Sequence, residues 1–324
     1  MTTSIVTGGA GFLGSHLVDA LAKRGESVVV LDNLTTGRLA NLESAISSGR
    51  VTFVYADVAV DATALREILA GGGVTKVDCI FHLASPASPN AYSRHPWETL
   101  AVNGIGTMSL IDIALQHHAR FIFSSTSEVY GDPLVHPQSE DYFGNVDPIG
   151  PRSCYDEGKR FGEAAVAAAV SKRGLAGRIV RFFNCYGPRM QSADGRLIPA
   201  LLEAAANRAP LPIQGTGEQT RSMTYVDDAI ELLLLVADRR QPMLQPINIG
   251  SDDERSVNEI ARLLAHVLQV EFTPEYSAGR PGDPQRRRPD LRRARALGWQ
   301  AATSLEDGLR LTYDWFSRES GLFV

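Results

Sequence analysis

The sequence contains few cysteines, which excludes a disulfide-stabilised fold. Only Cys79, Cys154 and Cys185 occur among 324 residues. Three widely separated thiols give neither a disulfide framework nor the ligand spacing of a zinc site, and they suit a reducing compartment. We therefore expect a cytoplasmic protein that carries no metal.

The sequence also lacks a long apolar run and an excess of basic charge. Its longest strongly apolar stretch, residues 232–237, is far shorter than the roughly 20 residues of a membrane-spanning helix, and the N-terminal residues show no targeting pattern. Lys and Arg number 32 against 37 Asp and Glu, and 44% of the residues are hydrophobic. This composition is typical of a folded globular protein and predicts binding to neither membranes nor nucleic acid.

Alternating strand and helix patterns fill the first half of the chain and predict a doubly wound parallel α/β sheet of the Rossmann type. The predicted strands are Ser4–Thr7, Ser27–Leu31, Val51–Tyr55, Cys79–Leu83, Arg120–Ser124 and Gly177–Arg181, and the predicted helices include Gly14–Lys23, Thr99–His117 and Cys154–Val170. After Asn184 the pattern loosens into a smaller α/β domain that still contains a helix at Asp227–Arg239 and a strand at Pro246–Ile249. We expect one domain at residues 1–181, with returning segments near 226–250, and a second at 182–324.

A glycine-rich turn between the first strand and the first helix indicates a nucleotide site. Gly8, Gly11 and Gly14 leave room for a tight turn and for a pyrophosphate at the helix N-terminus. Such a turn could serve packing alone, but Asp32 follows Gly14 by 18 residues at the end of the next strand. A carboxylate there accepts hydrogen bonds from an adenosine ribose and repels a 2′-phosphate, so the sequence predicts NAD rather than NADP, although Arg38 lies nearby. The predicted cofactor-binding residues also include Phe12, Leu13, Asn33, Asp57, Val58 and Leu83, although Asp57 could instead cap a turn.

A tyrosine and a lysine one helical turn apart indicate a unit for proton transfer. Tyr155 and Lys159 share a helix face, and the hydroxyl-rich run 124–128 ends a strand where parallel sheets bind ligands. A free tyrosine titrates at about pH 10, so we expect the Lys159 ammonium and a positive nicotinamide ring to lower the pKa of the phenol. A tyrosine and a lysine four residues apart often occur on helices by chance. The interpretation as a proton-transfer unit therefore depends on the glycine turn and the hydroxyl-rich strand end.

Together these motifs resemble the extended short-chain dehydrogenase/reductase family of nucleotide-sugar enzymes. Finer strings resemble its UDP-glucuronate decarboxylases, also called UDP-xylose synthases, over essentially the whole chain. These strings are His82–Pro89, Thr126–Pro133, Pro148–Arg160, Arg181–Met190, Gln219–Ser222 and Arg287–Asp290. The resemblance implies NAD-dependent decarboxylation of UDP-glucuronate to UDP-xylose and carbon dioxide through a 4-keto intermediate, with NAD recycled. It also implies that residues 1–181 bind NAD and that residues 182–324 bind the UDP-sugar.

The resemblance further implies roles for single residues. It assigns catalysis to Thr126, Ser127, Glu128, Tyr155, Lys159 and Arg287, and substrate binding to Pro86, Tyr92, Glu128, Asn184, Arg189, Arg221 and Arg287. Tyr155 exchanges the proton of the sugar C4 hydroxyl, Thr126 hydrogen-bonds the same oxygen, and Lys159 also holds the nicotinamide ribose. Glu128 and Arg287 address the C5/C6 end. A glutamate beside a substrate carboxylate is electrostatically costly, so we expect Glu128 to be partly protonated or offset by Arg287.

Single positions separate related activities. Sugar 4,6-dehydratases have an Asp-Glu pair where this chain has Ser127 and Glu128, because an acid must protonate the leaving hydroxyl, and Ser127 cannot serve. A UDP-sugar 4-epimerase, which needs no glutamate at this position, is the first alternative. An oxidative decarboxylase that releases the 4-keto pentose is another, and a nucleotide-binding sensor on the same fold is a third.

Two further features concern partners. Seven arginines lie between Arg280 and Arg295, and because the whole chain is acidic we expect most of them to form an ion-paired or solvated face rather than a nucleic-acid site. The helices at Thr99–His117 and Tyr155–Val170 have small apolar faces that could simply cover the sheet. By the resemblance they pair two subunits, so we expect a homodimer.

Overall fold

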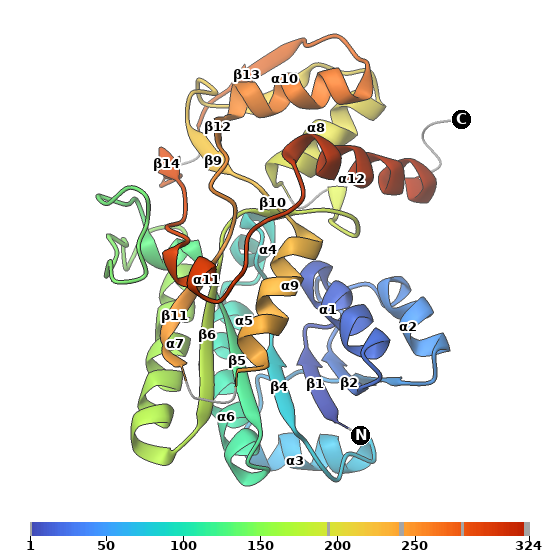
Figure 1. Cartoon of the computed structure of the whole chain (residues 1–324), viewed down its shortest axis with the longest axis vertical. Helices are drawn as coiled ribbons and strands as arrows, with labels where there is room; N and C mark the ends of the chain where they lie inside the picture. The colour runs from blue at the N-terminus through green and yellow to red at the C-terminus, as the bar shows by residue number, and fades with distance from the viewer. Residues whose placement is uncertain (1, 193–194, 240–242, 280–281, 321–324) are drawn as a thin grey trace.

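A seven-stranded parallel sheet forms one half of the molecule (Figure 1). The computed structural model describes residues 2–192, 195–239, 243–279 and 282–320. In sheet order the strands are β11 (Met243–Ile249), β6 (Ala176–Phe182), β5 (Arg120–Thr126), β4 (Cys79–His82), β1 (Thr3–Thr7), β2 (Ser27–Asp32) and β3 (Val51–Tyr55). The strand order reverses between β1 and β4, where doubly wound sheets bind ligands beyond the carboxyl ends of the strands. The predicted doubly wound parallel fold is confirmed.

Successive residues of one strand face two separate hydrophobic layers. Val28 and Val30 of β2 belong to the layer that contains α1 (Phe12–Lys23) and α9 (Val226–Ala237). Val29 and Leu31 belong to the opposite layer, with α3 (Ala62–Gly71), α6 (Thr107–Gln116) and α7 (Ser153–Arg173). Because side chains alternate along a strand, a continuous β-branched run buries both faces of the sheet.

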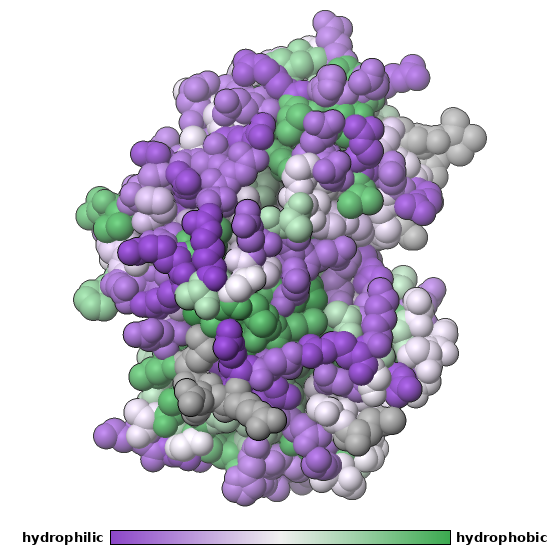
Figure 2. All heavy atoms as spheres, in the orientation of Figure 1, coloured by the Kyte–Doolittle hydropathy of each residue, from purple (hydrophilic) through white to green (hydrophobic). Residues whose placement is uncertain are grey.

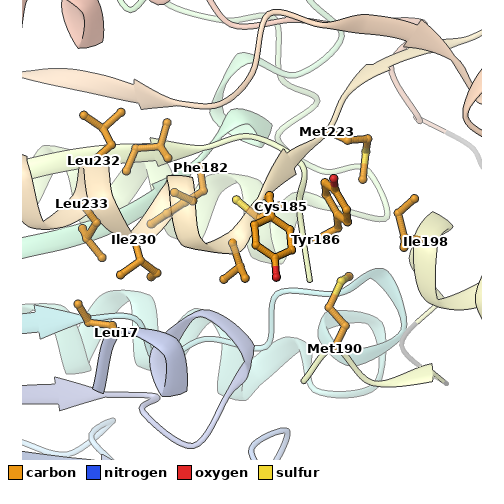
Figure 3. Close-up of a cluster of buried hydrophobic side chains, with 14 of the residues drawn as sticks. Leu17, Phe182, Cys185, Tyr186, Met190, Ile198, Met223, Ile230, Leu232 and Leu233 are labelled. Atoms are coloured by element: carbon orange, nitrogen blue, oxygen red, sulfur yellow. The ribbon is translucent and has the colours of Figure 1, made fainter. Parts of the chain in front are cut away.

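The first of these layers continues into the second half of the chain. In Figure 3, Leu17 points from α1 toward Ile230 and Leu233 of α9, and Met190, Met223 and Ile198 extend the same buried cluster. Helix α9 leads into β11, which pairs with β6 at the sheet edge. The region near 226–250 thus returns to the sheet, while the division of function at residue 181 stays a prediction.

The remaining elements lie beyond the carboxyl ends of the strands (Figure 1). They include a three-stranded sheet of β12 (Glu254–Ser256), β9 (Thr220–Ser222) and β14 (Arg286–Arg287), and two pairs, β13 (Pro274–Ser277) with β8 (Leu211–Gln214) and β10 (Thr224–Tyr225) with β7 (Cys185–Tyr186). The accompanying helices are α8 (Leu197–Ala206), α10 (Val257–Leu268), α11 (Arg292–Ala296) and α12 (Leu305–Ser320). Figure 2 shows the side of the molecule seen in Figure 1. Most residues on that side are hydrophilic, and hydrophobic ones are gathered near its middle.

The helix predicted at Thr99–His117 differs in detail. The chain forms α5 (Pro96–Ala101), a π-helical turn η2 (Val102–Gly106) and then α6. Within the turn Gly106 lies so close to β3's following loop that an added Cβ would lie 3.0 Å from the carbonyl oxygen of Val58. Sequence periodicity also missed short elements, namely η1 (Leu39–Leu42), α2 (Glu43–Ser47), α4 (Pro89–Arg94) and η3 (Ser127–Tyr130). Among the described residues, no helix combines the length and apolar character needed to cross a membrane.

Candidate functional site

A cavity of about 550 Å³ lies beyond the carboxyl ends of the strands and is lined by every residue predicted to act in the site. These residues are Gly8, Gly11, Phe12, Leu13, Gly14, Asp32, Asn33, Asp57, Val58, Leu83, Pro86, Tyr92, Thr126, Ser127, Glu128, Tyr155, Lys159, Asn184, Arg189, Arg221 and Arg287. They come from the ends of β1, β2, β4 and β5, from the segment after β3, from helices α1, α4 and α7, and from the second half of the chain. The fold therefore brings the predicted set together, while the role of each residue stays a prediction.

The glycine turn leaves room for a diphosphate at the start of α1. Gly8 has a φ of +69°, and an added Cβ would lie 2.7 Å from the Cα of Ala84. A Cβ on Gly14 would overlap the Gly8 carbonyl oxygen. Gly11 is the N-cap of α1 and has no side chain to cover the free N–H groups of the first turn. These positions fit a dinucleotide whose pyrophosphate contacts the helix N-terminus.

Two carboxylates lie at the predicted ribose end of the cavity. Asp32 ends β2, and Asp57 follows β3. The Asp32 carboxylate accepts the N–H groups of Ala10 (2.9 Å) and Leu34 (2.8 Å) and is 8% exposed. Burial raises its pKa, although both hydrogen bonds oppose this. Asp57 accepts the N–H of Ala59 at 2.8 Å and so caps a turn, as the alternative interpretation has it, while also lining the cavity.

Tyr155 and Lys159 lie on the buried face of α7, beside the end of β5. The Lys159 ammonium donates to the Ser124 carbonyl at 2.7 Å and lies 5.9 Å from the centroid of the Tyr155 ring. The Tyr155 ring stacks on Tyr92, with 5.3 Å between centroids and 10° between planes. Thr126 ends β5 and its hydroxyl accepts the Glu128 N–H at 3.2 Å. A hydroxyl, a phenol and an ammonium thus meet at one end of the cavity.

The electrostatics of this pair differ from the sequence-based expectation. Burial raises the pKa of the Tyr155 hydroxyl, opposed by a hydrogen bond with Thr126, so the predicted lowering of this pKa by Lys159 is not what the structure shows. Burial also lowers the pKa of Lys159 to about 7. Each group is buried, and burial disfavours its charged form. Burial therefore favours the neutral form of the Tyr155 side chain.

Glu128 is enclosed by two arginines, one of which the sequence did not identify. Both terminal nitrogens of Arg287 donate to the two Glu128 oxygens, the longer bond being 2.9 Å. Arg152, one residue before α7, donates to Glu128 Oε2 as well. Burial would raise the pKa of Glu128, but Arg287 and then Arg152 lower it overall. Of the two predicted alternatives, the structure favours the offset of Glu128 by Arg287 over its partial protonation.

Arg152 and Asp283 are site residues that sequence reasoning missed. Arg221 Nη2 donates to Asp283 Oδ2 at 2.6 Å, and Asp283 Oδ1 lies 3.6 Å from Arg152 Nη1. All three line the cavity. Arg152 stands in the Pro148–Arg160 string, three residues before Tyr155, so its place just ahead of that helix was the available signal.

Asn184, between β6 and β7, and Arg189, which follows β7, both line the cavity. Arg189 Nη2 donates to Asp19 Oδ2 of α1 at 2.7 Å, while its Nη1 is buried without a hydrogen-bond partner. The side-chain oxygen of Asn184 is likewise buried and unpaired. These orphaned polar atoms in a cavity wall suit a polar ligand, because buried polar groups are normally paired.

Other arginines of the run 280–295 and the buried His82 have structural partners. Arg286, Arg292, Arg293 and Arg295 form ion pairs with carboxylates, which confirms the predicted ion-paired face, whereas Arg280 lies outside the described residues. His82 is buried between the hydroxyls of Thr7 and Thr107, and burial lowers its pKa to about 3. Within the described part of the chain, no cluster of His, Cys, Asp or Glu suits a metal ion.

The chain is similar in sequence to known proteins. The model of the NAD dependent epimerase/dehydratase family matches residues 4–250. UDP-glucuronic acid decarboxylase 1 of Danio rerio is 42% identical over 320 residues, which are 97% of this chain and 72% of that protein. UDP-glucuronic acid decarboxylase 6 of Arabidopsis thaliana is 41% identical over 320 residues, which are 98% of this chain and 90% of that protein.

Solved structures share the arrangement of the whole chain. The UDP-glucose 4-epimerase of Thermotoga maritima, solved with UDP-glucose, has a TM-score of 0.88 and 30% identity, covering 98% of this chain and 100% of its own. The UDP-glucuronic acid 4-epimerase of Bacillus cereus, in complex with UDP-glucuronic acid and NAD, has a TM-score of 0.86 and 28% identity, with coverage of 98% and 100%.

Proposed function

The chain belongs to the NAD-dependent epimerase/dehydratase family, and we propose that it decarboxylates UDP-glucuronate to UDP-xylose and carbon dioxide. NAD is the cofactor of this family. The observation that carries the proposal is the Arg287–Glu128–Arg152 cluster in the same cavity as Tyr155 and Lys159. The relatives named UDP-glucuronic acid decarboxylase support it, since they match almost the whole chain.

The reaction needs an oxidised carbon next to the one that bears the carboxylate. A uronic acid does not lose its C6 carboxylate readily, because the electrons left on C5 have no acceptor. Oxidation of the C4 hydroxyl gives a β-keto acid, whose C5–C6 bond breaks to release carbon dioxide and leave an enolate at C4 and C5. Gly8, Gly11, Gly14 and Asp32 would hold NAD, which would supply the oxidation at C4 as a hydride acceptor. After carbon dioxide has left, C5 would take up a proton and the C4 ketone would regain the hydride, so no net reduced cofactor forms.

Thr126, Tyr155 and Lys159 act at C4. We assign to Tyr155 the exchange of the C4 hydroxyl proton, with Thr126 hydrogen-bonded to the same oxygen. Burial raises the pKa of the Tyr155 phenol and lowers that of Lys159, so the assignment depends on the positive nicotinamide ring, which would favour the phenolate when NAD is bound. General acid/base assistance of this kind contributes about 100- to 10,000-fold to the rate.

Arg287, Arg152 and Glu128 act at the carboxylate end. Arg287, Arg152 and Arg221 face the carboxylates of Glu128 and Asp283, and burial raises the pKa of the neighbouring Asp156 to about 7. The guanidinium groups therefore outnumber the carboxylates that are charged throughout the neutral range, which favours binding of the substrate carboxylate. Ser127, buried beside Glu128, supplies no acid that could protonate a leaving hydroxyl, which disfavours dehydration. We assign diphosphate binding to Arg221 and contacts with the rest of the nucleotide sugar to Pro86, Tyr92, Asn184 and Arg189.

One incubation separates the related activities. The purified chain is mixed with UDP-glucuronate and NAD, and carbon dioxide, the sugar product and the absorbance of reduced nicotinamide are followed together. Carbon dioxide with UDP-xylose and no net reduced cofactor supports the proposal. Net reduced cofactor with a 4-keto pentose indicates an oxidative decarboxylase, a C4-inverted sugar without carbon dioxide indicates a 4-epimerase, and nucleotide binding without any product indicates a sensor.

We further propose that the protein is a cytoplasmic homodimer. Apolar side chains stand exposed along α5, η2, α6 and α7, among them Trp97 (80% exposed), Ile105, Met108 and Phe161. Several exposed apolar side chains on neighbouring helices are typical of a subunit interface. Light scattering should give a dimer at micromolar concentration, and Met108→Glu should give a monomer. The three free cysteines support a reducing compartment such as the cytoplasm.

A further inference from the structure

We propose that Gln138 is a positioning residue that fixes Arg287 against Glu128. It acts through residues 136–140, which we call the strap. The inference rests on the proposed function, because it assigns Gln138 to the decarboxylation step of that reaction. Gln138 itself is buried, and it is not among the described residues that line the cavity.

The strand that carries Arg287 is short and needs support on both sides. Strand β14 contains only Arg286 and Arg287 and lies at one edge of the three-stranded sheet, where it pairs in parallel with β9. In this register Arg287 lies beside Arg221. Two residues of strand on one neighbour define a position weakly, so the geometry of Arg287 depends on what holds the other side.

The strap holds that other side through Gln138. The Gln138 N–H donates to the Arg288 carbonyl at 2.8 Å, and the Arg288 N–H donates back to Gln138 Oε1 at 2.8 Å. The Asp290 N–H donates to the Gln138 carbonyl at 2.9 Å, and Gln138 Nε2 donates to the Val135 carbonyl at 2.9 Å. One buried side chain therefore joins the strap to the residue that follows Arg287.

The main sheet anchors the strap. Asn248 of β11 is buried and donates its side-chain N–H groups to the carbonyls of Gln138 (2.9 Å) and Asp290 (3.2 Å). Its backbone N–H donates to Glu140 of the strap at 3.0 Å. The Tyr130 hydroxyl donates to the Asn248 side-chain oxygen at 2.8 Å, and Tyr130 belongs to η3, the same short helix as Glu128. The Glu128 and Arg287 backbones are thus held by one buried network.

The hydrogen bonds of Gln138 should support the decarboxylation step and not the oxidation at C4. The C4 step depends on Thr126, Tyr155 and Lys159, which are held by β5 and α7. The loss of the carboxylate depends on Arg287, which must present two N–H groups to Glu128 at once. A displacement of about 1 Å in a catalytic group can slow a step up to about 100-fold. Loosening the strap should therefore slow decarboxylation and spare the oxidation at C4.

Two substitutions at Gln138 and one control test this separation. Gln138→Leu removes the side-chain hydrogen bonds to Arg288, Val135 and His136, whereas Gln138→Glu keeps an acceptor for the Arg288 N–H. Gln116→Leu makes the same replacement at an exposed site at the end of α6 and serves as the control. Each variant is loaded with NAD and mixed rapidly with UDP-glucuronate, and reduced nicotinamide and carbon dioxide are followed together with the thermal unfolding midpoint.

We expect Gln138→Leu to form reduced nicotinamide at close to the wild-type rate and to accumulate it, while carbon dioxide release slows on the order of 10- to 100-fold. Gln138→Glu should recover part of this loss, and Gln116→Leu should behave as the wild type. Wild-type carbon dioxide release by Gln138→Leu, or an equal slowing of both signals, would overturn the inference. If Gln138→Leu does not fold, unchanged kinetics in Gln138→Glu overturn it. A wild-type chain that releases no carbon dioxide from UDP-glucuronate would instead overturn the proposed function.

Discussion

Replacing Arg287 with alanine removes the bidentate partner of a buried carboxylate. In the wild type Glu128 accepts hydrogen bonds from Arg287 and Arg152, and its side chain is 13% exposed. After the substitution Arg152 still hydrogen-bonds Glu128, and Arg221 acts on it from nearby. Both the stability of the fold and the carboxylate end of the proposed site should suffer, while the cofactor end of the cavity is untouched.

The expected loss of stability follows from the number of partners left. Removing one member of a buried ion pair typically destabilises a protein by about 3–5 kcal/mol. Because Arg152 still donates to Glu128, we expect the lower part of this range or slightly less, about 2–3 kcal/mol. Carbon dioxide release should fall far more than NAD binding does.

The dependence on pH has a definite sign. Arg287 and Arg152 hold the folded pKa of Glu128 below its usual value, so the pair contributes stability above the unfolded pKa of about 4.3 and loses it as pH falls through the folded pKa. The difference in unfolding free energy between wild type and Arg287→Ala should be complete at pH 7 and shrink below about pH 4.

A double-mutant cycle in urea unfolding measures the coupling. Glu128→Gln, Arg287→Ala and the double variant are compared with the wild type, and NAD binding serves as the control for the intact cofactor end. The double variant should lose at least about 1 kcal/mol less than the sum of the single variants. Strict additivity, or a loss that does not shrink as the pH is lowered below about 4, would refute the reasoning.

Three further outcomes are expected. Tyr155→Phe should bind NAD normally and slow formation of reduced nicotinamide by at least about 100-fold in rapid mixing, and near-normal rates would exclude it as the proton-transfer group. Lys159→Met should be inactive yet raise the unfolding free energy at pH 7 by at least about 1 kcal/mol, because burial lowers the folded pKa of Lys159 to about 7 and the unfolded chain binds the extra proton; this advantage should vanish as pH approaches about 10. Gly162→Ala should destabilise the fold by about 1–3 kcal/mol despite the better helix propensity of alanine, since its Cβ would overlap the Phe123 ring, and unchanged urea unfolding would contradict this packing.

Features with a local signal were accessible from the sequence. The run Ser27–Leu31 predicts a buried strand because β-branched residues fill both faces, and β2 spans Ser27–Asp32. The turn at Gly8 and the carboxylate of Asp32 follow from their spacing along one strand–helix–strand unit. Tyr155 and Lys159 lie one turn apart on a single helix, so their common face follows from helix geometry alone.

Features that depend on distant partners were not accessible. Gln138 and Arg288 are 150 positions apart, and the residues next to them in the sequence do not predict the hydrogen bond between them. Arg152 was passed over because its partner Glu128 sits in another element. The raised pKa of Tyr155 depends on how deeply the folded chain buries it, which a pattern of residues does not give. The π-helical turn η2 lies within an otherwise regular helical pattern.

Arg287 and Glu128 lie far apart in the sequence, so the parts of the cavity form in a definite order while the chain is synthesised. The two residues are separated by 159 positions, and the match to the family model ends at residue 250, before Arg287. As the chain leaves the ribosome, the strands of the sheet emerge long before β14 does. A nascent chain should therefore complete the nucleotide end of its cavity first, and Glu128 should gain its second guanidinium only when β14 has been synthesised.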